Sequence, residues 1–328
     1  MESRIDEIGA RGMAARRPGK ASRIHRFGGP EVIALEDVIP PEPGDGEVLV
    51  RVKAAGVGPW DAWVRAGRSA LPQPLPLTLG SDISGIVEAA GRGVTGFVPG
   101  DAVFGMTNPR FTGGYADYAI ASASMLAKKP GILSHVEAAS VPVVAVTAWQ
   151  ALFEQAQLSR DQSVLIHGAA GGVGAFAVQL AHTAGLRVYA TARGRDVGYV
   201  RSLGADTVLD GHTARFEDVF PPVDAVIDLV GGELQMRSYA LLHKGGALIS
   251  TVSPPDRAEA TALGVRAAFF LVDVTTGRLS RIGAMIEEGA LAAAVGTVLP
   301  LADARLAHEL LEGTRERPHG KIVLRVSE

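Results

Sequence analysis

Short apolar runs, separated by glycine and proline, make up most of the first 130 residues. They are rich in β-branched side chains, and one short stretch with helical character, residues 60–65, interrupts them. A succession of short strands with glycine turns predicts a partly closed β-barrel. The expected strands lie at residues 32–38, 48–54, 80–88, 100–104 and 114–120.

The pattern changes near residue 134, where segments with helical spacing of apolar residues begin to alternate with short apolar runs. Such alternation predicts an α/β unit with a doubly wound parallel sheet. We expect helices at residues 135–140, 143–156, 175–184, 194–203, 234–242 and 278–288. We expect strands at residues 164–166, 186–191, 207–209, 225–228, 247–250 and 267–272.

A short strand–helix–strand pattern, residues 295–326, closes the chain. It is too small to form a core of its own, so we expect it to return to the first domain. The predicted organisation is therefore a β-rich domain of residues 22–142 and 290–328 and an α/β domain of residues 143–289. A flexible basic tail, residues 1–21, is expected to precede them.

The junction of an expected strand and an expected helix carries Gly168-Ala-Ala-Gly-Gly-Val-Gly174. Glycines let the backbone turn tightly and bring N–H groups close to a phosphate, at the positive end of the following helix. The strict G-x-G-x-x-G spacing is not met, because Ala169 occupies its first position. The strand–turn–helix context nevertheless favours dinucleotide binding over a tight turn without a ligand.

Composition narrows the function classes. Of the 328 residues, 47% are hydrophobic and 20% charged, as is typical of a soluble globular protein. The net charge of −3 does not indicate a nucleic-acid partner, and no apolar run is long enough to span a membrane. We therefore expect a cytoplasmic protein. The chain has no cysteine, which excludes disulfides, a thiol nucleophile and cysteine-based zinc sites.

Eight short motifs follow one another along the chain. They are Ala55-Gly-Val-Gly-Pro-Trp-Asp61, Gly80-Ser-Asp-Ile-Ser-Gly-Ile-Val87, Gly113-Gly-Tyr-Ala-Asp-Tyr118, Thr147-Ala-Trp-Gln-Ala-Leu152, the glycine turn, Leu203-Gly-Ala-Asp206, Asp228-Leu-Val-Gly-Gly232 and His319-Gly-Lys-Ile-Val-Leu324. In this order they resemble the medium-chain dehydrogenase/reductase superfamily, and within it the zinc-free quinone oxidoreductases. The resemblance covers residues 22–326. It implies a GroES-like substrate domain and a Rossmann dinucleotide-binding domain.

The resemblance also bears on metal binding. Zinc-dependent members carry G-H-E where this chain has Gly80-Ser-Asp82, so Ser81 takes the position of a zinc ligand. Together with the lack of cysteine, this predicts a metal-free protein. Such a protein lacks the Lewis acid with which zinc enzymes polarise an alcohol.

Two arginines follow the strand after the glycine turn. Arg193 and Arg195 could hold a 2′-phosphate, whereas NAD binding favours an acid at this strand end. The first acid, Asp196, is expected on the next helix, so we predict NADP(H). Gly211 stands where many quinone oxidoreductases carry a tyrosine near the 2′-phosphate, which leaves the arginines to supply specificity. The predicted cofactor-binding residues are Thr147, Ala170, Gly171, Gly172, Val173, Gly174, Thr191, Arg193, Arg195, Val252 and Leu271.

The loop of residues 58–61 is implied to lie near the nicotinamide. Gly58 replaces an asparagine that is usual in the family, so Trp60 is expected either to shape the pocket or to anchor its short helix. No acid–base set is evident, and we expect His167 to be a satisfied core group and Asp82 a local hydrogen-bond acceptor. The candidate substrate-pocket residues are Trp60, Asp61, Tyr115, Phe269 and Phe270.

We predict a zinc-independent, NADPH-dependent oxidoreductase that transfers hydride to a quinone or a similar small, apolar conjugated carbonyl. Two alternatives remain open: a double-bond reductase of enals or enones, and a non-catalytic NADPH-binding protein like some crystallins. In the family, the strand at residues 266–272 often pairs with its copy in a second subunit. We therefore expect a homodimer.

Overall fold

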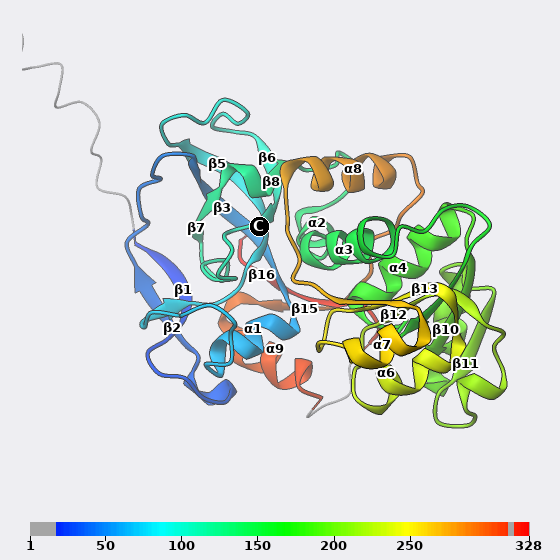
Figure 1. Ribbon diagram of the computed structural model, residues 1–328. Coiled ribbons are helices and arrows are strands. Elements are labelled where there is room, and N and C mark those ends of the chain that lie inside the picture. Colours follow the sequence, from blue (N-terminus) through cyan, green and yellow to red (C-terminus); the bar gives the residue numbers. More distant parts are fainter. Residues whose placement is uncertain (1–17, 314–317, 328) are drawn as a thin grey trace, which may run out of the picture.

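The computed structural model describes residues 18–313 and 318–327. It has two parts that lie side by side, a β-rich part and an α/β part, with α8 beside their junction (Figure 1). Nearly all of the expected basic tail, residues 1–17, lies outside the described residues. The ordered fold begins earlier than expected, because the first strand starts at Gly19.

The β-rich part contains two sheets. A seven-stranded sheet has the order β15-β16-β3-β5-β6-β8, with β7 also paired to β3, and a three-stranded sheet has the order β2-β1-β4. Its elements up to residue 128 are β1 (Gly19–Ile24), β2 (Ala34–Val38), β3 (Glu47–Val57), α1 (Pro59–Arg65), β4 (Leu77–Thr78), β5 (Asp82–Ala90), β6 (Ala102–Met106), β7 (Tyr118–Ser122) and β8 (Leu126–Lys128). The long strand β3 is nearly all buried, because both of its edges are paired.

The last elements of the chain join this sheet. They are β15 (Val295–Pro300), α9 (Ala304–Leu311) and β16 (Lys321–Arg325). Strand β16 pairs antiparallel with β3, with Ile322 opposite Val57, and parallel with β15. The C-terminal strands therefore lie next to a strand about 270 residues earlier, which places Lys321 beside the loop that follows β3.

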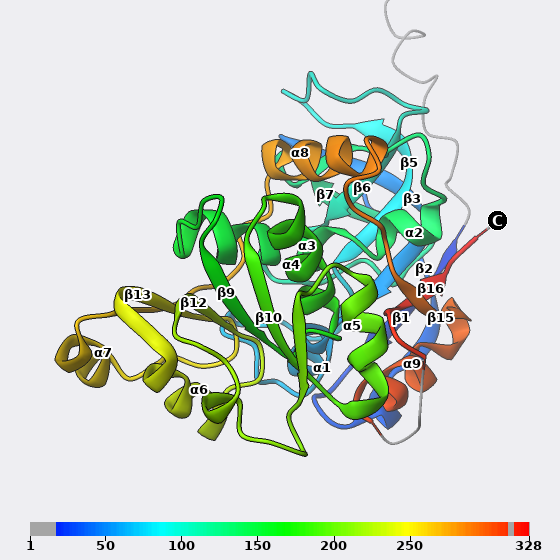
Figure 2. The same ribbon diagram turned by 90° about the vertical axis from the view of Figure 1, so that its right-hand side faces the viewer.

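The α/β part is built on a six-stranded parallel sheet of order β11-β10-β9-β12-β13-β14. Alternate residues of β9 serve opposite faces: Val164 and Ile166 pack with α3 and α4, and Leu165 packs with the side of α6 and α7 (Figure 2). The strands are β9 (Ser163–His167), β10 (Arg187–Ala192), β11 (Thr207–Asp210), β12 (Val223–Asp228), β13 (Leu242–Ser250) and β14 (Arg266–Phe269). The helices are α3 (Pro142–Trp149), α4 (Gly172–Thr183), α5 (Val197–Ser202), α6 (Glu233–Ser238), α7 (Arg257–Leu263) and α8 (Thr276–Glu287). Helix α2 (His135–Ala139) packs instead on β3, β5 and β16 of the β-rich part.

Several expected boundaries were wrong. The helix predicted at 143–156 is α-helical only to Trp149 and continues as a π-helix over Gln150–Gln155. The strand predicted at 267–272 ends at Phe269, and the one predicted from residue 114 begins at Tyr118. Helix α7 was not expected at all. Its Asp256 cap, which accepts from two backbone N–H groups, was the signal available in the sequence.

Candidate active site

The glycine turn connects β9 to α4 at the carboxyl edge of the parallel sheet. Gly168 has a positive φ of 71°, and a Cβ at residue 174 would lie 2.4 Å from the Gly168 carbonyl oxygen, so both positions require glycine. Gly171 is the N-cap of α4 and has no side chain that could cap the first turn. The N–H groups of that turn are therefore available to an anionic ligand, at the positive end of a 12-residue helix.

His167 ends β9 directly below this turn and is buried. Its Nδ1 lies 2.8 Å from Thr191 Oγ1 and its Nε2 lies 3.0 Å from Ser238 Oγ. Burial lowers the pKa of His167 to about 4, so the ring is neutral at pH 7. The Thr191 hydroxyl, a predicted cofactor ligand, is thus engaged with His167 inside the sheet.

Asp228 is a second buried polar group at this edge. Its carboxylate accepts hydrogen bonds from Val230 N, Gly231 N, Gln235 Nε2 and Ser250 Oγ, at 2.8–3.0 Å. These bonds hold the loop between β12 and α6. The Asp228-Leu-Val-Gly-Gly232 motif alone does not reveal this role, because the four donors come from three separate segments.

The two predicted arginines differ in their surroundings. Arg193 follows β10, is exposed, and makes no side-chain hydrogen bond or ion pair with any residue the structure describes. Arg195 is also exposed, but its Nε lies 3.7 Å from Asp196 Oδ1. The same Asp196 oxygen lies 3.2 Å from His319 Nδ1, which comes from the C-terminal segment of the other part. Asp196 ends a short 3-10 helix before α5.

Gly58 is the N-cap of α1, directly after β3, and Trp60 is the second residue of that helix. A Cβ at residue 58 would lie 2.3 Å from Cζ2 of Trp60, so the indole occupies the space that any side chain at residue 58 would need. The Trp60 Nε1–H donates to Ser81 Oγ at 3.0 Å, and Phe111 lies beside the ring with 6.2 Å between centroids. The half-buried indole forms a wall, and the lack of a side chain at Gly58 leaves room for it.

Two charged residues, Lys321 and Asp82, pair beside the indole. Lys321 Nζ lies 3.0 Å from Asp82 Oδ2 and 4.1 Å from the centroid of the Trp60 ring. The other Asp82 oxygen accepts from Val143 N at 3.1 Å, which confirms a hydrogen-bond acceptor there. Burial raises the pKa of Asp82, and the nearby Lys321 ammonium opposes that shift.

Asp61 is fully buried on α1. Its Oδ2 accepts from Gly58 N at 2.8 Å and from the Tyr115 hydroxyl at 2.9 Å, whereas Oδ1 has no hydrogen-bond partner within the described part of the chain. Burial raises the pKa of Asp61 to about 7, although the Gly58 N–H and Lys321 favour the charged form. Tyr115 is also fully buried, and its ring packs against Gly80. As they stand, neither side chain faces solvent.

The remaining predicted residues lie at different depths. The Thr147 hydroxyl donates to the Val143 carbonyl at 2.6 Å within its own helix. Val252 is 40% exposed and Leu271 63% exposed, so both are accessible to a ligand. Phe269 and Phe270 are half-buried at the end of β14. The cofactor role predicted for Thr147, Val252 and Leu271 and the substrate-pocket role predicted for Phe269 and Phe270 therefore stay predictions.

A small cavity of about 10 Å³ lies where the two parts of the molecule meet. Gly171 and Gly172 line it from the turn, and Gly320 and Lys321 from the start of β16. Tyr199 also lines it: its ring is stacked on His319 with an interplanar angle of 4°, and its buried hydroxyl has no partner among the described residues. The cavity is too narrow for a whole dinucleotide, but it joins the turn to Lys321.

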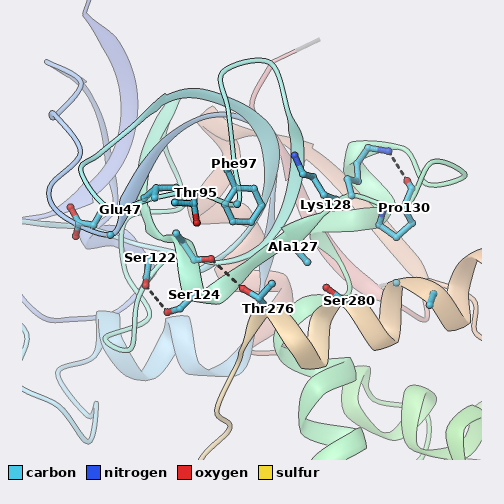
Figure 3. A pocket seen from close by; sticks show the side chains of 18 of the residues that line it. Glu47, Thr95, Phe97, Ser122, Ser124, Ala127, Lys128, Pro130, Thr276 and Ser280 are labelled. Carbon is cyan, nitrogen blue, oxygen red and sulfur yellow. Dashed lines mark hydrogen bonds between the residues drawn. The ribbon is translucent and has the colours of Figure 1, made fainter.

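A larger groove of about 870 Å³ lies elsewhere, between one end of the β-rich part and α8 (Figure 3). Phe97 and Lys128 line one side, and Thr276 and Ser280 of α8 line the other (Figure 3). Its charged groups have local partners, such as Asp101 for Lys128. None of the predicted site residues lines it, so this groove is not the candidate active site.

Over residues 18–313 and 318–327, no three or more histidine and carboxylate side chains are grouped so that they could hold a metal ion. In the same ranges, no helix combines the length and the apolar character that crossing a membrane requires.

Comparison with known proteins gives matches over almost the whole chain. Residues 44–131 match the alcohol dehydrogenase GroES-like domain, and residues 203–324 match a family described as zinc-binding dehydrogenase. The quinone oxidoreductase of Homo sapiens is 32% identical over 324 residues, which cover 93% of this chain and 97% of the human one.

Solved structures agree with these matches. The quinone oxidoreductase from Coxiella burnetii is similar with a TM-score of 0.87 and 34% identity, covering 94% of this chain and 100% of that one. A structure described as an NAD-dependent alcohol dehydrogenase is similar with a TM-score of 0.86, 32% identity and the same coverage. The quinone oxidoreductases among these matches belong to a group of oxidoreductases that use a nicotinamide cofactor. The chain therefore belongs to the medium-chain dehydrogenase/reductase superfamily, as an oxidoreductase of this group.

Proposed function

We propose that this protein is a metal-independent, NADPH-dependent reductase of quinones or similar conjugated carbonyls. The observation that carries the proposal is the cavity at the junction of the two parts. Lys321 lines this cavity together with Gly171 and Gly172, while its ammonium lies on the face of Trp60. Lys321 thus contacts both the aromatic ring of Trp60 and the cavity bordered by the start of α4, which suits an anion.

The residues present fit a nicotinamide dinucleotide. The uncapped first turn of α4 suits a pyrophosphate, and the Tyr199 hydroxyl is a buried donor that lacks an acceptor. Arg193 is exposed and unpaired among the described residues, so its guanidinium is available to a 2′-phosphate. When bound, a reduced nicotinamide dinucleotide supplies the hydride that such an acceptor takes up.

The chain's own contribution is to select and orient the acceptor. Trp60 and Phe111 present aromatic surfaces that suit a flat, apolar molecule. Ser81, which takes the sequence position of a zinc ligand in zinc-dependent relatives, accepts a hydrogen bond from Trp60 and so orients the indole. A quinone or enone needs no metal to polarise it, because the reduced oxygen takes a proton from solvent.

The first test is oxidation of NADPH, followed at 340 nm, with 1,4-benzoquinone, a bulkier ortho-quinone, an enal and a ketone, each repeated with NADH. We expect quinone-dependent loss of NADPH, with NADH much slower and with no effect of a chelator. Activity with the enal alone would assign the protein to the alkene reductases. Binding of NADPH without turnover of any acceptor would favour the crystallin-like alternative, and loss of activity with the chelator would contradict metal independence.

The variant Arg193→Gln tests the cofactor preference. A charge-assisted hydrogen bond contributes about 1.5–3 kcal/mol, so we expect the Kd for NADPH to rise at least about tenfold and the Kd for NADH to stay unchanged. Arg201→Gln is the matched control, because Arg201 is also exposed but lies at the far end of α5. An equal loss of NADH binding in Arg193→Gln would show that the arginine does not recognise the 2′-phosphate.

We also propose a cytoplasmic homodimer that pairs through the edge strand β14. This strand pairs with β13 on one side, and no described strand pairs with its other side. Its residues Ala267, Ala268 and Phe269 are half-buried, and an unpaired apolar edge favours association. A monodisperse monomer in solution scattering would contradict this arrangement.

A further inference from the structure

The Lys321 ammonium is a buried charged group near the candidate site whose hydrogen bonds are incomplete. Its side chain is only 6% exposed, and an ammonium has three N–H donors. One donates to Asp82 Oδ2 at 3.0 Å, and the Trp60 ring covers another side at 4.1 Å. Within the described residues no other acceptor lies within hydrogen-bond distance of Nζ, so one donor remains for a ligand.

The backbone fixes where that donor lies. Lys321 is the first residue of β16, and the pairing of β16 with β3 sets it opposite the start of the Trp60 loop. Gly56 leaves room for its stem, since a Cβ there would lie 3.2 Å from Lys321 Cε and 2.3 Å from the Ala139 carbonyl oxygen. Lys321 therefore contacts the face of Trp60 and also lines the cavity that Gly171 and Gly172 border.

We propose that Lys321 binds the oxygen of the acceptor's carbonyl group and stabilises the negative charge that develops on it. The proposal rests on the proposed reductase function and adds the group that takes the place of a metal as electrophile. A fixed positive charge in a site that excludes water stabilises a developing oxyanion more strongly than solvent does. Asp82 and the Trp60 face hold the ammonium in place before the acceptor arrives, so little reorganisation is needed.

The step balances without any further reactant. The acceptor gains two electrons and one hydrogen as hydride from the reduced dinucleotide, and its oxygen gains one proton from solvent. Lys321 donates a hydrogen bond throughout and keeps its protons.

The test uses 4-nitrophenol, a flat probe whose phenolate mimics the oxyanion and absorbs at 400 nm. With the protein saturated with NADP⁺, we expect the wild type to bind the phenolate about tenfold more tightly than the phenol, which lowers the apparent pKa of the bound probe by about one unit. Lys321→Met should abolish this preference. It should also lower kcat/KM for benzoquinone about 30-fold, within the range of one charged hydrogen bond, while the Kd for NADPH changes less than twofold.

Removing Lys321 alone leaves Asp82 buried without its partner, so we expect the single variant to be strongly destabilised. The double variant Asp82→Asn/Lys321→Met removes both charges and keeps an oxygen for the Val143 N–H, and it should show the same loss of phenolate preference. Lys128→Met is the control, because Lys128 is exposed and lies in the distant groove.

Three results would overturn the proposal: no binding of the phenolate to the wild type, an unchanged preference in the double variant, or a loss of NADPH affinity with the preference intact. The last would assign the ammonium to the cofactor phosphates instead. Since the probe is bound and not reduced, these results are separate from the reductase assay. A wild type that turns over no acceptor would overturn the proposed function, whether or not it binds the phenolate.

Discussion

The two parts of the molecule bury their polar groups in different ways. At the edge of the parallel sheet, His167 has a partner on each ring nitrogen, and the Asp228 carboxylate accepts from four donors. In the β-rich part, Asp61 keeps one oxygen without a partner within the described residues, and Lys321 keeps a free donor. Satisfied groups hold a structure, whereas incompletely satisfied ones are available to a ligand.

The difference follows from how each edge is built. Asp228 is surrounded by donors from its own loop and from the next strand, so the sheet itself satisfies it. The group around Trp60 is assembled from the β3 loop, the start of β5 and the start of β16, which meet only through the fold. One of its incompletely satisfied groups, Lys321, lines the cavity at the junction of the two parts.

The largest expected effect is on stability as a function of pH. Burial raises the pKa of Asp61 from 3.8 to about 7, so the folded state keeps a proton there that the unfolded chain has lost. The contribution of Asp61 to the free energy of unfolding is therefore greatest below pH 4 and falls as the pH rises to about 7. At about 1.4 kcal/mol per pKa unit, this loss amounts to roughly 4 kcal/mol.

His167 acts in the opposite direction. Its pKa is lowered from 6.5 to about 4, so stability is lost as pH falls from about 6.5 to 4, by roughly 3 kcal/mol. Burial lowers the pKa of His308 to about 3, which adds to this acid-side loss.

Urea-unfolding midpoints between pH 5 and 8 separate the two effects. In the wild type the two effects partly cancel, so we expect its urea midpoint to change little with pH. We expect the urea midpoint of Asp61→Asn to rise with pH and that of His167→Gln to fall with pH. His212→Gln is the control, because His212 is exposed. Parallel profiles for all three variants would contradict the comparison.

The second effect is the loss of a fully satisfied carboxylate. Asp228→Ala leaves buried donors without an acceptor, so we expect the free energy of unfolding to fall by about 3 kcal/mol. Asp37→Ala, which removes an exposed ion pair with Lys20, should cost less than about 1 kcal/mol. A similar small loss in both variants, measured by urea unfolding, would show that the Asp228 network does not hold the sheet edge.

The smallest effect concerns the Trp60 wall. Gly58→Asn brings a side chain into the space of the indole, and overpacking of this kind costs about 2 kcal/mol. The double variant Gly58→Asn/Trp60→Val should recover more than half of that loss, because the two positions compete for one space. Gly96→Asn is the matched control, since a Cβ at Gly96 meets nothing within 4 Å. Additive losses in the double variant would contradict the competition.

The two parts also differed in how far their structure could be predicted from sequence. The glycine turn could be located because strand, turn and helix are contiguous, and each glycine answers to a local constraint, as at Gly168 and Gly174. The alternation after residue 134 predicted the parallel sheet for the same reason. Boundaries such as the π-helical turn at Gln150 and the short β14 were missed, because packing rather than local pattern decides them.

The sequence by itself determined the superfamily, the parallel sheet and the Gly58 substitution, since these depend on residues that are neighbours in the chain. Only the tertiary structure decided that Lys321 meets Asp82 and Trp60, across a separation of more than 230 residues. It also decided that the Thr191 hydroxyl contacts His167 and that Asp61 is buried. Spacing in a sequence does not determine which distant side chains share a cavity, because that depends on strand pairing and on the burial that follows from it.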